Sequence, residues 1–311
     1  LLMRLLAAGI VIALILLNLA GVGKLTNVEI IIVSVNLLVL LALGIYGLAH
    51  WDTSQLTAGI SPRPIWSSLI GGASIFMAYE GFQLLTYEYD KIKNPEKSFM
   101  PTLMSAVIFV VILYAVVALG ATMVGGATSM ISFKEIALSI SAESAFGKTG
   151  LIVMTVAAGF ATAAAINSTL FSTANLSKRI ASQNELPSWF NHTNKNDVPD
   201  RSIIVLGTLA GTLAIVGSLS SLVEAASLAF LFTFGIVNWI AYRESEKRKW
   251  IPLMGIIIGI LVGLALIFRL VISKPIALGG ILALVLLIIM GRPYLLKKKE
   301  KTQQKAQEDE H

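Results

Sequence analysis

An acidic residue and a glycine stand side by side in the middle of a long apolar stretch. The run from Ser74 to Gln83 contains Glu80 and Gly81 inside a segment that otherwise has the composition of a membrane-spanning helix. Polar groups at that depth are costly and by default indicate a functional site. A break at Glu80-Gly81 would free carbonyls and helix ends to bind a solute. Alternatively, Gly81 packs against another helix and Glu80 pairs with a neighbour.

A second group of polar side chains follows one face of a later apolar segment. Ser168, Ser172 and Asn175 have the spacing i, i+4, i+7 of a helix face, and Thr169 with Thr173 widens the same stripe. Hard oxygen atoms of this kind bind cations or polar substrates. They also form hydrogen bonds between helices, and that is the interpretation we favour from the pattern alone.

The composition restricts the class of protein. Of 311 residues, 56% are hydrophobic and 14% charged, against about 25% charged in soluble proteins, and the mean hydropathy is +0.79. A disordered chain, a disulfide scaffold and an ordinary soluble enzyme are excluded. Without cysteine and with three widely separated histidines, no metal and no cofactor are expected. The net charge of +6 reflects membrane topology, so no nucleic-acid partner is expected.

An enzyme acting inside the membrane is not expected either. The apolar segments contain no convincing paired-carboxylate, Ser–Lys or His-metal constellation. Glu80 and Glu224 are the main acidic candidates. We expect Glu224 in the first turn of a helix, where the helix dipole favours a carboxylate.

The apolar segments predict an all-α, polytopic bundle of transmembrane helices with about nine spans. Gly217 to Ser221 is the one break without charge, between the sixth and seventh spans. A signal peptide is the competing interpretation of the first segment, which lacks an obvious small-residue cleavage site. The predicted spans are 1–20, 29–49, 64–88, 101–125, 149–177, 202–220, 222–241, 251–270 and 275–293.

Basic residues in the loops predict the orientation. Alternate loops and the tail collect 18 of the 24 Lys and Arg residues on one side, which is therefore the cytoplasmic side. The C-terminus is then cytoplasmic, in a multi-pass protein of the plasma membrane. We expect a transmembrane domain over residues 1–296 and a charged, disordered tail over 297–311.

Three motifs together resemble a known family. Phe76 to Phe82, followed by Glu88 to Lys97 with its Lys-Asn-Pro-Glu-Lys run, resembles the sixth helix and following loop of amino acid permeases of the amino acid–polyamine–organocation superfamily. Asn18-Leu19-Ala20-Gly21-Val22 resembles the end of the family's fourth helix. The stretch from Ser177 to Pro187, with Val198-Pro199, resembles the loop after the eighth.

The resemblance implies a fold of twelve helices, ten of them in a five-plus-five inverted repeat. The nine predicted spans then correspond to helices four to twelve, and the first three would be absent from this chain. We therefore expect a missing N-terminal segment or a partner chain. The partners implied are an amino acid substrate and the lipid bilayer.

The resemblance also implies which residues bind the substrate. Met77, Ala78, Tyr79, Glu80 and Gly81 match the broken sixth helix of the family, whose carbonyls receive the substrate's amino group. The family's broken first helix, which holds the substrate carboxylate, has no counterpart here.

Ion coupling to H⁺ or Na⁺ is a further implication. Asn36 lies near the position of a lysine that replaces sodium in some proton-coupled relatives. Ser168 and Thr169 lie at the depth of the hydroxyls that bind sodium in other relatives.

The sequence thus predicts secondary active transport of amino acids or related amines by alternating access, in a symporter or antiporter. The alternative is a non-transporting remnant or subunit-like membrane module, since half of the substrate site is missing. The particular amino acid, the coupling ion and the oligomeric state are not encoded in any recognisable motif.

Overall fold

The described part of the chain is mainly helical. The structure is a computed structural model and describes residues 2–21, 26–57, 59–61, 64–74, 76–87, 89, 92–246 and 248–273, with the single positions 275, 278–280, 282, 286 and 290. The α-helices are α1 (Leu2–Leu19), α2 (Thr26–Ala49), α3 (Ser54–Thr57), α4 (Ile65–Ser74), α5 (Leu84–Tyr87), α6 (Pro95–Gly125), α7 (Ala127–Phe133), α8 (Ala137–Ser182), α9 (Asp200–Val216), α10 (Leu219–Glu244) and α11 (Trp250–Ser273). Short 3-10 helices are η2 (Phe76–Tyr79), η4 (Lys134–Ile136) and η5 (Ser188–Asn191).

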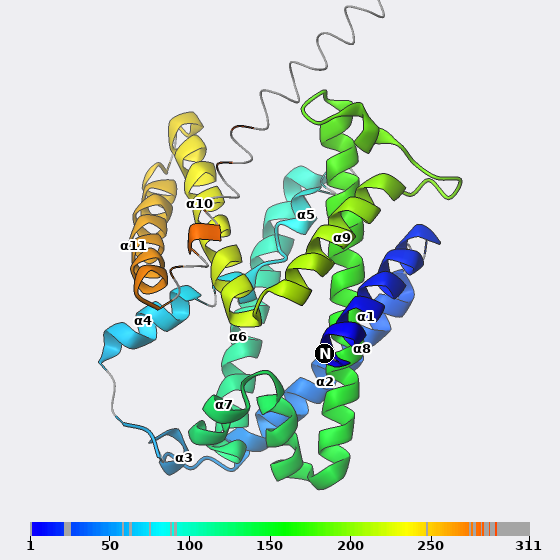
Figure 1. The fold of residues 1–311 in the computed structure, drawn as a ribbon. Helices are drawn as coiled ribbons and strands as arrows, with labels where there is room; N and C mark the ends of the chain where they lie inside the picture. Colours follow the sequence, from blue (N-terminus) through cyan, green and yellow to red (C-terminus); the bar gives the residue numbers. More distant parts are fainter. Residues whose placement is uncertain are drawn as a thin grey trace, which may run out of the picture.

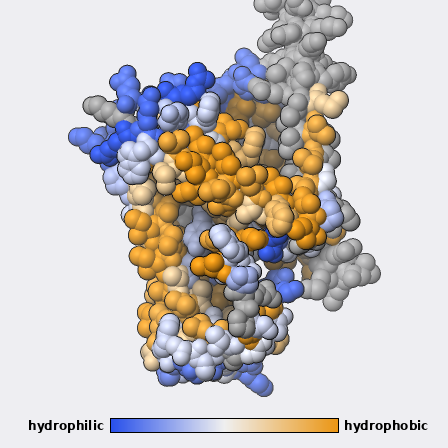
Figure 2. Space-filling view, turned by 90° about the vertical axis from the view of Figure 1, so that its left-hand side faces the viewer, coloured by the Kyte–Doolittle hydropathy of each residue, from blue (hydrophilic) through white to orange (hydrophobic). Residues whose placement is uncertain are grey.

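Five helices in the described part are long and apolar enough to cross a membrane: α2, α6, α8 together with α7, α10 and α11. Their surfaces carry many exposed large apolar side chains, as expected of helices that face lipid. Figure 2 shows apolar residues over the middle height of one face and hydrophilic residues gathered at its upper and lower ends. The protein is therefore a polytopic helical membrane protein.

Seven of the nine predicted spans coincide with single helices of the structure. Five coincide with these long helices, and two more coincide with the shorter α1 and α9. Gly217 follows α9 and Ser218 caps α10, where its hydroxyl accepts a hydrogen bond from Ser221 N–H at 3.3 Å, so the uncharged break at this point is confirmed. The predicted 275–293 span lies mostly outside the described residues, as does the predicted 297–311 tail. The count of nine and the inverted repeat remain predictions.

The helices pack in two groups, and α6 packs on α2 and α8 of one group and contacts η2 (Figure 1). α8 contacts α1, α2 and α9, while α10 and α11 lie side by side and hold α4. The buried apolar cores are Leu43, Ala121, Ala142 and Met154; Ala73, Leu231, Leu266 and Leu270; and Ala174, Val198 and Ile203.

Glycine allows α2 and α6 to cross at very close range. A side-chain carbon added at Gly47 would collide with the backbone of Gly120, and one added at Gly120 would collide with the backbone of Gly44. Small residues of this kind are how membrane helices approach each other when water provides no hydrophobic driving force. The crossing fixes α6, which later supplies a side chain to the candidate site.

Candidate functional site

The predicted third span is broken, and the break contains the five predicted substrate residues. α4 ends at Ser74, η2 follows, and a turn at residues 80–83 leads into α5. Met77, Ala78 and Tyr79 lie in the 3-10 segment, and Glu80 and Gly81 lie in the turn. The predicted break at Glu80-Gly81 is therefore confirmed.

Gly81 is a turn glycine. Its φ of +126° lies in a region that other residues rarely adopt, and no atom lies within 4 Å of where a side-chain carbon would stand. The alternative of a close-packing glycine is therefore wrong. The Gly81 N–H donates to the side-chain oxygen of Gln83 at 2.8 Å, so the turn supplies its own hydrogen-bond acceptor.

Ser227 in α10 connects the two sides of the break. Its hydroxyl donates to the carbonyl of Ser74 at 3.1 Å and accepts from the N–H of Met77 at 3.0 Å. Ser227 is fully buried. It thus replaces hydrogen bonds that a continuous helix would have made internally, which non-helical backbone inside a membrane requires.

Tyr114 in α6 contacts the break from the other side. Its hydroxyl donates to the carbonyl of Ala78 at 2.8 Å, and its ring lies 5.2 Å from the ring of Tyr79, centroid to centroid. A carbonyl freed by the break is therefore within reach of side chains from outside the segment. Both rings remain partly exposed, at 39% for Tyr114 and 38% for Tyr79.

Aromatic packing holds the break against α10. The ring of Phe234 stacks on Phe82 at 5.5 Å and meets Phe76 edge-on at 6.1 Å. Phe230 lies 6.3 Å from Phe234 on the same helix. The apolar positions of the motif, Phe76 and Phe82, therefore fix the segment, and the residues between them are left for other contacts.

Glu80 has an unusual environment. Its Oε2 accepts a hydrogen bond from the amide of Gln83 at 2.8 Å, while its Oε1 is buried without a hydrogen-bond partner in the described part of the chain. The expected alternative, in which Glu80 pairs with a neighbouring helix, is not what these contacts show. Its described partner belongs to the same turn.

The three predicted ion-coupling residues lie elsewhere in the bundle. Asn36 is half-buried in α2, Ser168 is half-buried in α8, and Thr169 is exposed. The contacts of the described residues do not join these three to the break.

A polar junction that the sequence did not predict lies beside Ser168. The Asn18 side-chain amide donates to Asn167 Oδ1 at 2.7 Å, and the Asn167 amide donates to Glu29 Oε1 at 3.0 Å. This chain joins α1, α8 and α2. The sequence placed Asn167 next to the hydroxyl stripe but gave no signal that its side chain, 8% exposed, forms the interhelical contact.

Glu224 has a different role from the one expected. α10 begins at Leu219, so Glu224 is not in its first turn and the expectation of stabilisation by the helix dipole is wrong. Instead, Glu224 Oε1 lies 3.3 Å from Arg269 Nη2 of α11. The Glu224 side chain is 3% exposed and that of Arg269 37%, so a largely buried ion pair joins these two helices.

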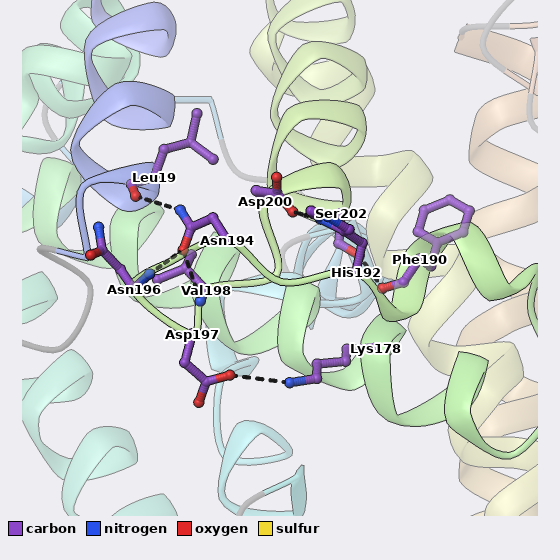
Figure 3. Close-up of polar contacts among 10 residues, drawn as sticks. All are labelled: Leu19, Lys178, Phe190, His192, Asn194, Asn196, Asp197, Val198, Asp200 and Ser202. Atoms are coloured by element: carbon purple, nitrogen blue, oxygen red, sulfur yellow. Dashed lines mark hydrogen bonds and ion pairs between the residues drawn. The ribbon is translucent and has the colours of Figure 1, made fainter.

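The loop between α8 and α9 holds the end of α1, although the two are about 175 positions apart in sequence (Figure 3). The Asn194 amide donates to the carbonyl of Leu19 at 2.9 Å, and its Oδ1 accepts from the N–H of Asn196 and of Val198. Two of the three sequence motifs, at the end of α1 and after α8, are therefore parts of one contact.

The same loop contains a hydrogen bond between a histidine and an aspartate at the start of α9. His192 Nδ1 donates to Asp200 Oδ1 at 2.7 Å (Figure 3). Burial raises the pKa of Asp200, but the hydrogen bonds with His192 and with the backbone of Arg201 outweigh it, so the net pKa lies below its usual value. The carboxylate is thus held in its charged form.

Comparison with known proteins points to one family. The amino acid permease family profile matches residues 1–291. The chain is 25% identical over 273 residues to the uncharacterized protein MJ0609 of Methanocaldococcus jannaschii, covering 86% of this chain and 62% of that protein. It is 27% identical over 264 residues to the inner membrane transport protein YbaT of Escherichia coli, covering 84% and 60%.

A plant relative extends the similarity. The vacuolar cationic amino acid transporter 4 of Arabidopsis thaliana is 26% identical over 227 residues, with 70% of this chain and 37% of that protein covered. The chain therefore spans about 60% or less of the length of these three relatives. With the family profile matching nearly the whole chain, this protein belongs to the amino acid permease family, as its Lys-Asn-Pro-Glu-Lys loop and broken third span implied.

Proposed function

We propose that the protein is a secondary transporter, not an enzyme, and carries amino acids or related amines across the membrane. The observation that carries the proposal is the broken third span, with Ala78 presenting its carbonyl to a hydroxyl from α6. The ammonium group of an amino acid also donates hydrogen bonds to backbone carbonyls, so Met77, Ala78, Tyr79, Glu80 and Gly81 form half of a substrate site. Membership of the amino acid permease family supports the substrate class.

The test is exchange of radiolabelled amino acid in proteoliposomes preloaded with unlabelled substrate. The names of the plant relatives suggest that the substrate range includes cationic amino acids, so the screen includes lysine and arginine beside neutral amino acids and amines. Uptake that a substrate competes away supports the proposal. Absence of exchange for every compound, with correctly inserted protein, removes it.

The mechanism that we propose is alternating access. The broken segment packs on α10, which packs on α11, whereas α8 packs on α1, α2 and α9. Two groups of helices of this kind provide a moving unit with the break and a scaffold with α8. Cysteine pairs placed across the two groups in this cysteine-free chain would report the movement as substrate-dependent crosslinking.

Ion coupling is a further part of the proposal. Asn36, Ser168 and Thr169 are candidates for coupling to H⁺ or Na⁺; Asn36 in α2 and Ser168 in α8 are half-buried, and Thr169 is the exposed neighbour of Ser168. Replacement of sodium by choline separates the ions: lost uptake supports Ser168 and Thr169 as sodium ligands, and unchanged uptake removes that role.

Location and orientation are proposed from the basic loops. With 18 of 24 basic residues on one side, the C-terminus lies in the cytoplasm and the membrane is the plasma membrane. Protease accessibility of a C-terminal tag in inside-out and right-side-out vesicles checks the orientation.

A further inference from the structure

Glu80 and Glu224 are two glutamates within the bundle whose carboxylates have different surroundings. Glu224 faces Arg269 at 3.3 Å. Glu80 has an amide partner on Oε2 and a buried Oε1 without a partner in the described residues. A carboxylate held away from water and from a cation is unfavourable, and the usual relief is to take up a positive charge.

Among the described residues, the groups around Glu80 with a printed contact do not provide that charge. Tyr87 in α5 is the described titratable side chain that interacts electrostatically with Glu80, and it is a neutral phenol. α6 brings Tyr114, which is bonded to the break's backbone. Among the basic residues of the surrounding helices, Lys178 of α8 pairs with an aspartate of the following loop, and Arg269 of α11 pairs with Glu224.

The lack of accessible space at Oε1 favours a proton over a larger cation at this oxygen. Glu80 Oε1 has essentially no accessible surface, so a sodium ion or an ammonium group could not reach it without moving the surrounding atoms. A proton needs no such room, because it forms an O–H bond on the oxygen itself. The hydrogen bond from Gln83 is on the other oxygen and can persist in both protonation states.

A hydrogen-bond chain connects this carboxylate to the backbone of the break. The Gln83 amide donates to Glu80 Oε2 at 2.8 Å, and the carbonyl oxygen of the same amide accepts from the N–H of Gly81 at 2.8 Å. Linked hydrogen bonds polarise one another, so a charge on Glu80 strengthens the bond at Gly81 and a proton weakens it. Gln83 is therefore a positioning residue between the charge and the turn.

We propose that Glu80 binds and releases the proton that drives transport, which rests on the function proposed above. In the binding step the Glu80 carboxylate takes up a proton from water and becomes a neutral acid. Release to water on the other side restores the carboxylate, and no electron is transferred. The change in charge alters the Gln83–Gly81 bond and thereby the conformation of the break.

Infrared spectroscopy tests the protonation site without any transport assay. The protein in lipid bilayers is titrated with acid, and the carbonyl band of a protonated carboxylic acid is followed. Since the chain has 18 Asp and Glu residues, the expected result is one titrating component of this band that is lost in Glu80→Gln and retained in Glu135→Gln, an exposed glutamate of η4. A band that is unchanged in Glu80→Gln overturns the proposal.

Proteoliposomes test the coupling. For one proton per substrate, an inward gradient of one pH unit supports up to about tenfold accumulation. The initial rate in the parent and in Glu80→Asp should depend on pH, and any remaining rate in Glu80→Gln should not. Gln83→Leu should retain the infrared band but shift the pH at which it titrates.

The outcomes separate this proposal from the one on which it rests. A parent that exchanges amino acid but accumulates none under a proton gradient overturns the role of Glu80 and leaves the transport function standing. A parent that exchanges no amino acid removes the transport function and the coupling role with it. Acceleration by cationic substrates alone, with no effect of pH, would assign Glu80 to the substrate's charge and overturn the proton proposal.

Discussion

The hydroxyl of Ser227 accepts a hydrogen bond from the N–H of Met77 at 3.0 Å, although the two residues are 150 positions apart in sequence. The same hydroxyl donates to the carbonyl of Ser74. One buried side chain of α10 therefore satisfies a donor and an acceptor on either side of the break. The break is part of the folded structure, and its conformation depends on the position of α10.

Ser227→Ala should destabilise the break. The N–H of Met77 and the carbonyl of Ser74 would lose a partner in a buried place, which costs about 1–3 kcal/mol. Thermal unfolding in detergent should show the loss, and substrate exchange should fall with it. Thr233→Ala is the matched control, because Thr233 lies exposed on the same helix and its hydroxyl donates to the carbonyl of Ala229, one turn earlier in that helix. Equal effects of the two substitutions would contradict the connecting role of Ser227.

Tyr114→Phe should increase the affinity for substrate. The hydroxyl of Tyr114 occupies the carbonyl of Ala78, which the proposed site offers to an ammonium group. Its removal, with the ring kept against Tyr79, frees an acceptor worth about 0.5–1.5 kcal/mol, or up to about tenfold in the dissociation constant. Equilibrium binding of labelled amino acid measures the change, and Tyr46→Phe, whose ring lies against Phe146, is the control. A weaker affinity in Tyr114→Phe would mean that the hydroxyl itself binds substrate.

The ion pair between α10 and α11 should be sensitive to loss of one partner. Glu224→Gln leaves Arg269 without its counter-charge and should destabilise the protein by about 3 kcal/mol, the low end for buried pairs because the arginine side chain is 37% exposed. A double substitution, Glu224→Leu with Arg269→Met, should recover most of the loss.

The exposed pair of Lys178 and Asp197 provides the comparison for this experiment. Its side chains are 35% and 80% exposed, so Lys178→Met should cost at most about 1 kcal/mol. Thermal unfolding of all variants in one detergent gives the ranking. A loss in Glu224→Gln no larger than that in Lys178→Met would contradict the buried pairing.

Asp200→Asn should lower stability at neutral pH and have no effect in acid. The pKa of Asp200 is lower in the folded protein than its ordinary value of about 3.9. Its contribution is therefore complete above the unfolded pKa and disappears as the pH falls through the folded pKa. For a pair this exposed, the loss at pH 7 is up to about 1 kcal/mol.

The measurement is the unfolding temperature of Asp200→Asn and parent between about pH 7 and pH 3. The two curves should converge below about pH 4. Glu135→Gln, at an exposed glutamate of η4, is the control. Curves that stay equally far apart in acid would mean that the carboxylate is not responsible for the difference.

The sequence predicted the break but not the residues that surround it. Apolar length and the Glu80-Gly81 pair were visible as a pattern, and the structure confirms a break there. The contacts of Ser227 and Tyr114 with the break were not predicted. In the sequence, a hydroxyl residue in an apolar helix looks the same whether its side chain bonds the backbone of a distant segment, as Ser227 does, or the backbone of its own helix, as Thr233 does.

Helix boundaries explain the error at Glu224. The predicted span began at residue 222, which put Glu224 in the first turn, whereas α10 begins three residues earlier at Leu219. The ion pair with Arg269 also depends on how α11 packs, and no local pattern reveals that. Local composition thus predicted elements and breaks, while contacts between distant segments had to come from the fold.

The most direct test of the proposed substrate site compares two glycines by amino acid exchange in proteoliposomes. Gly81 has a φ of +126° in the turn, whereas Gly159 lies within α8 with open space around it. Gly81→Leu should abolish exchange because leucine cannot keep the turn without strain, and Gly159→Leu should retain it. Undiminished exchange in Gly81→Leu would contradict the assignment of the substrate site to the break.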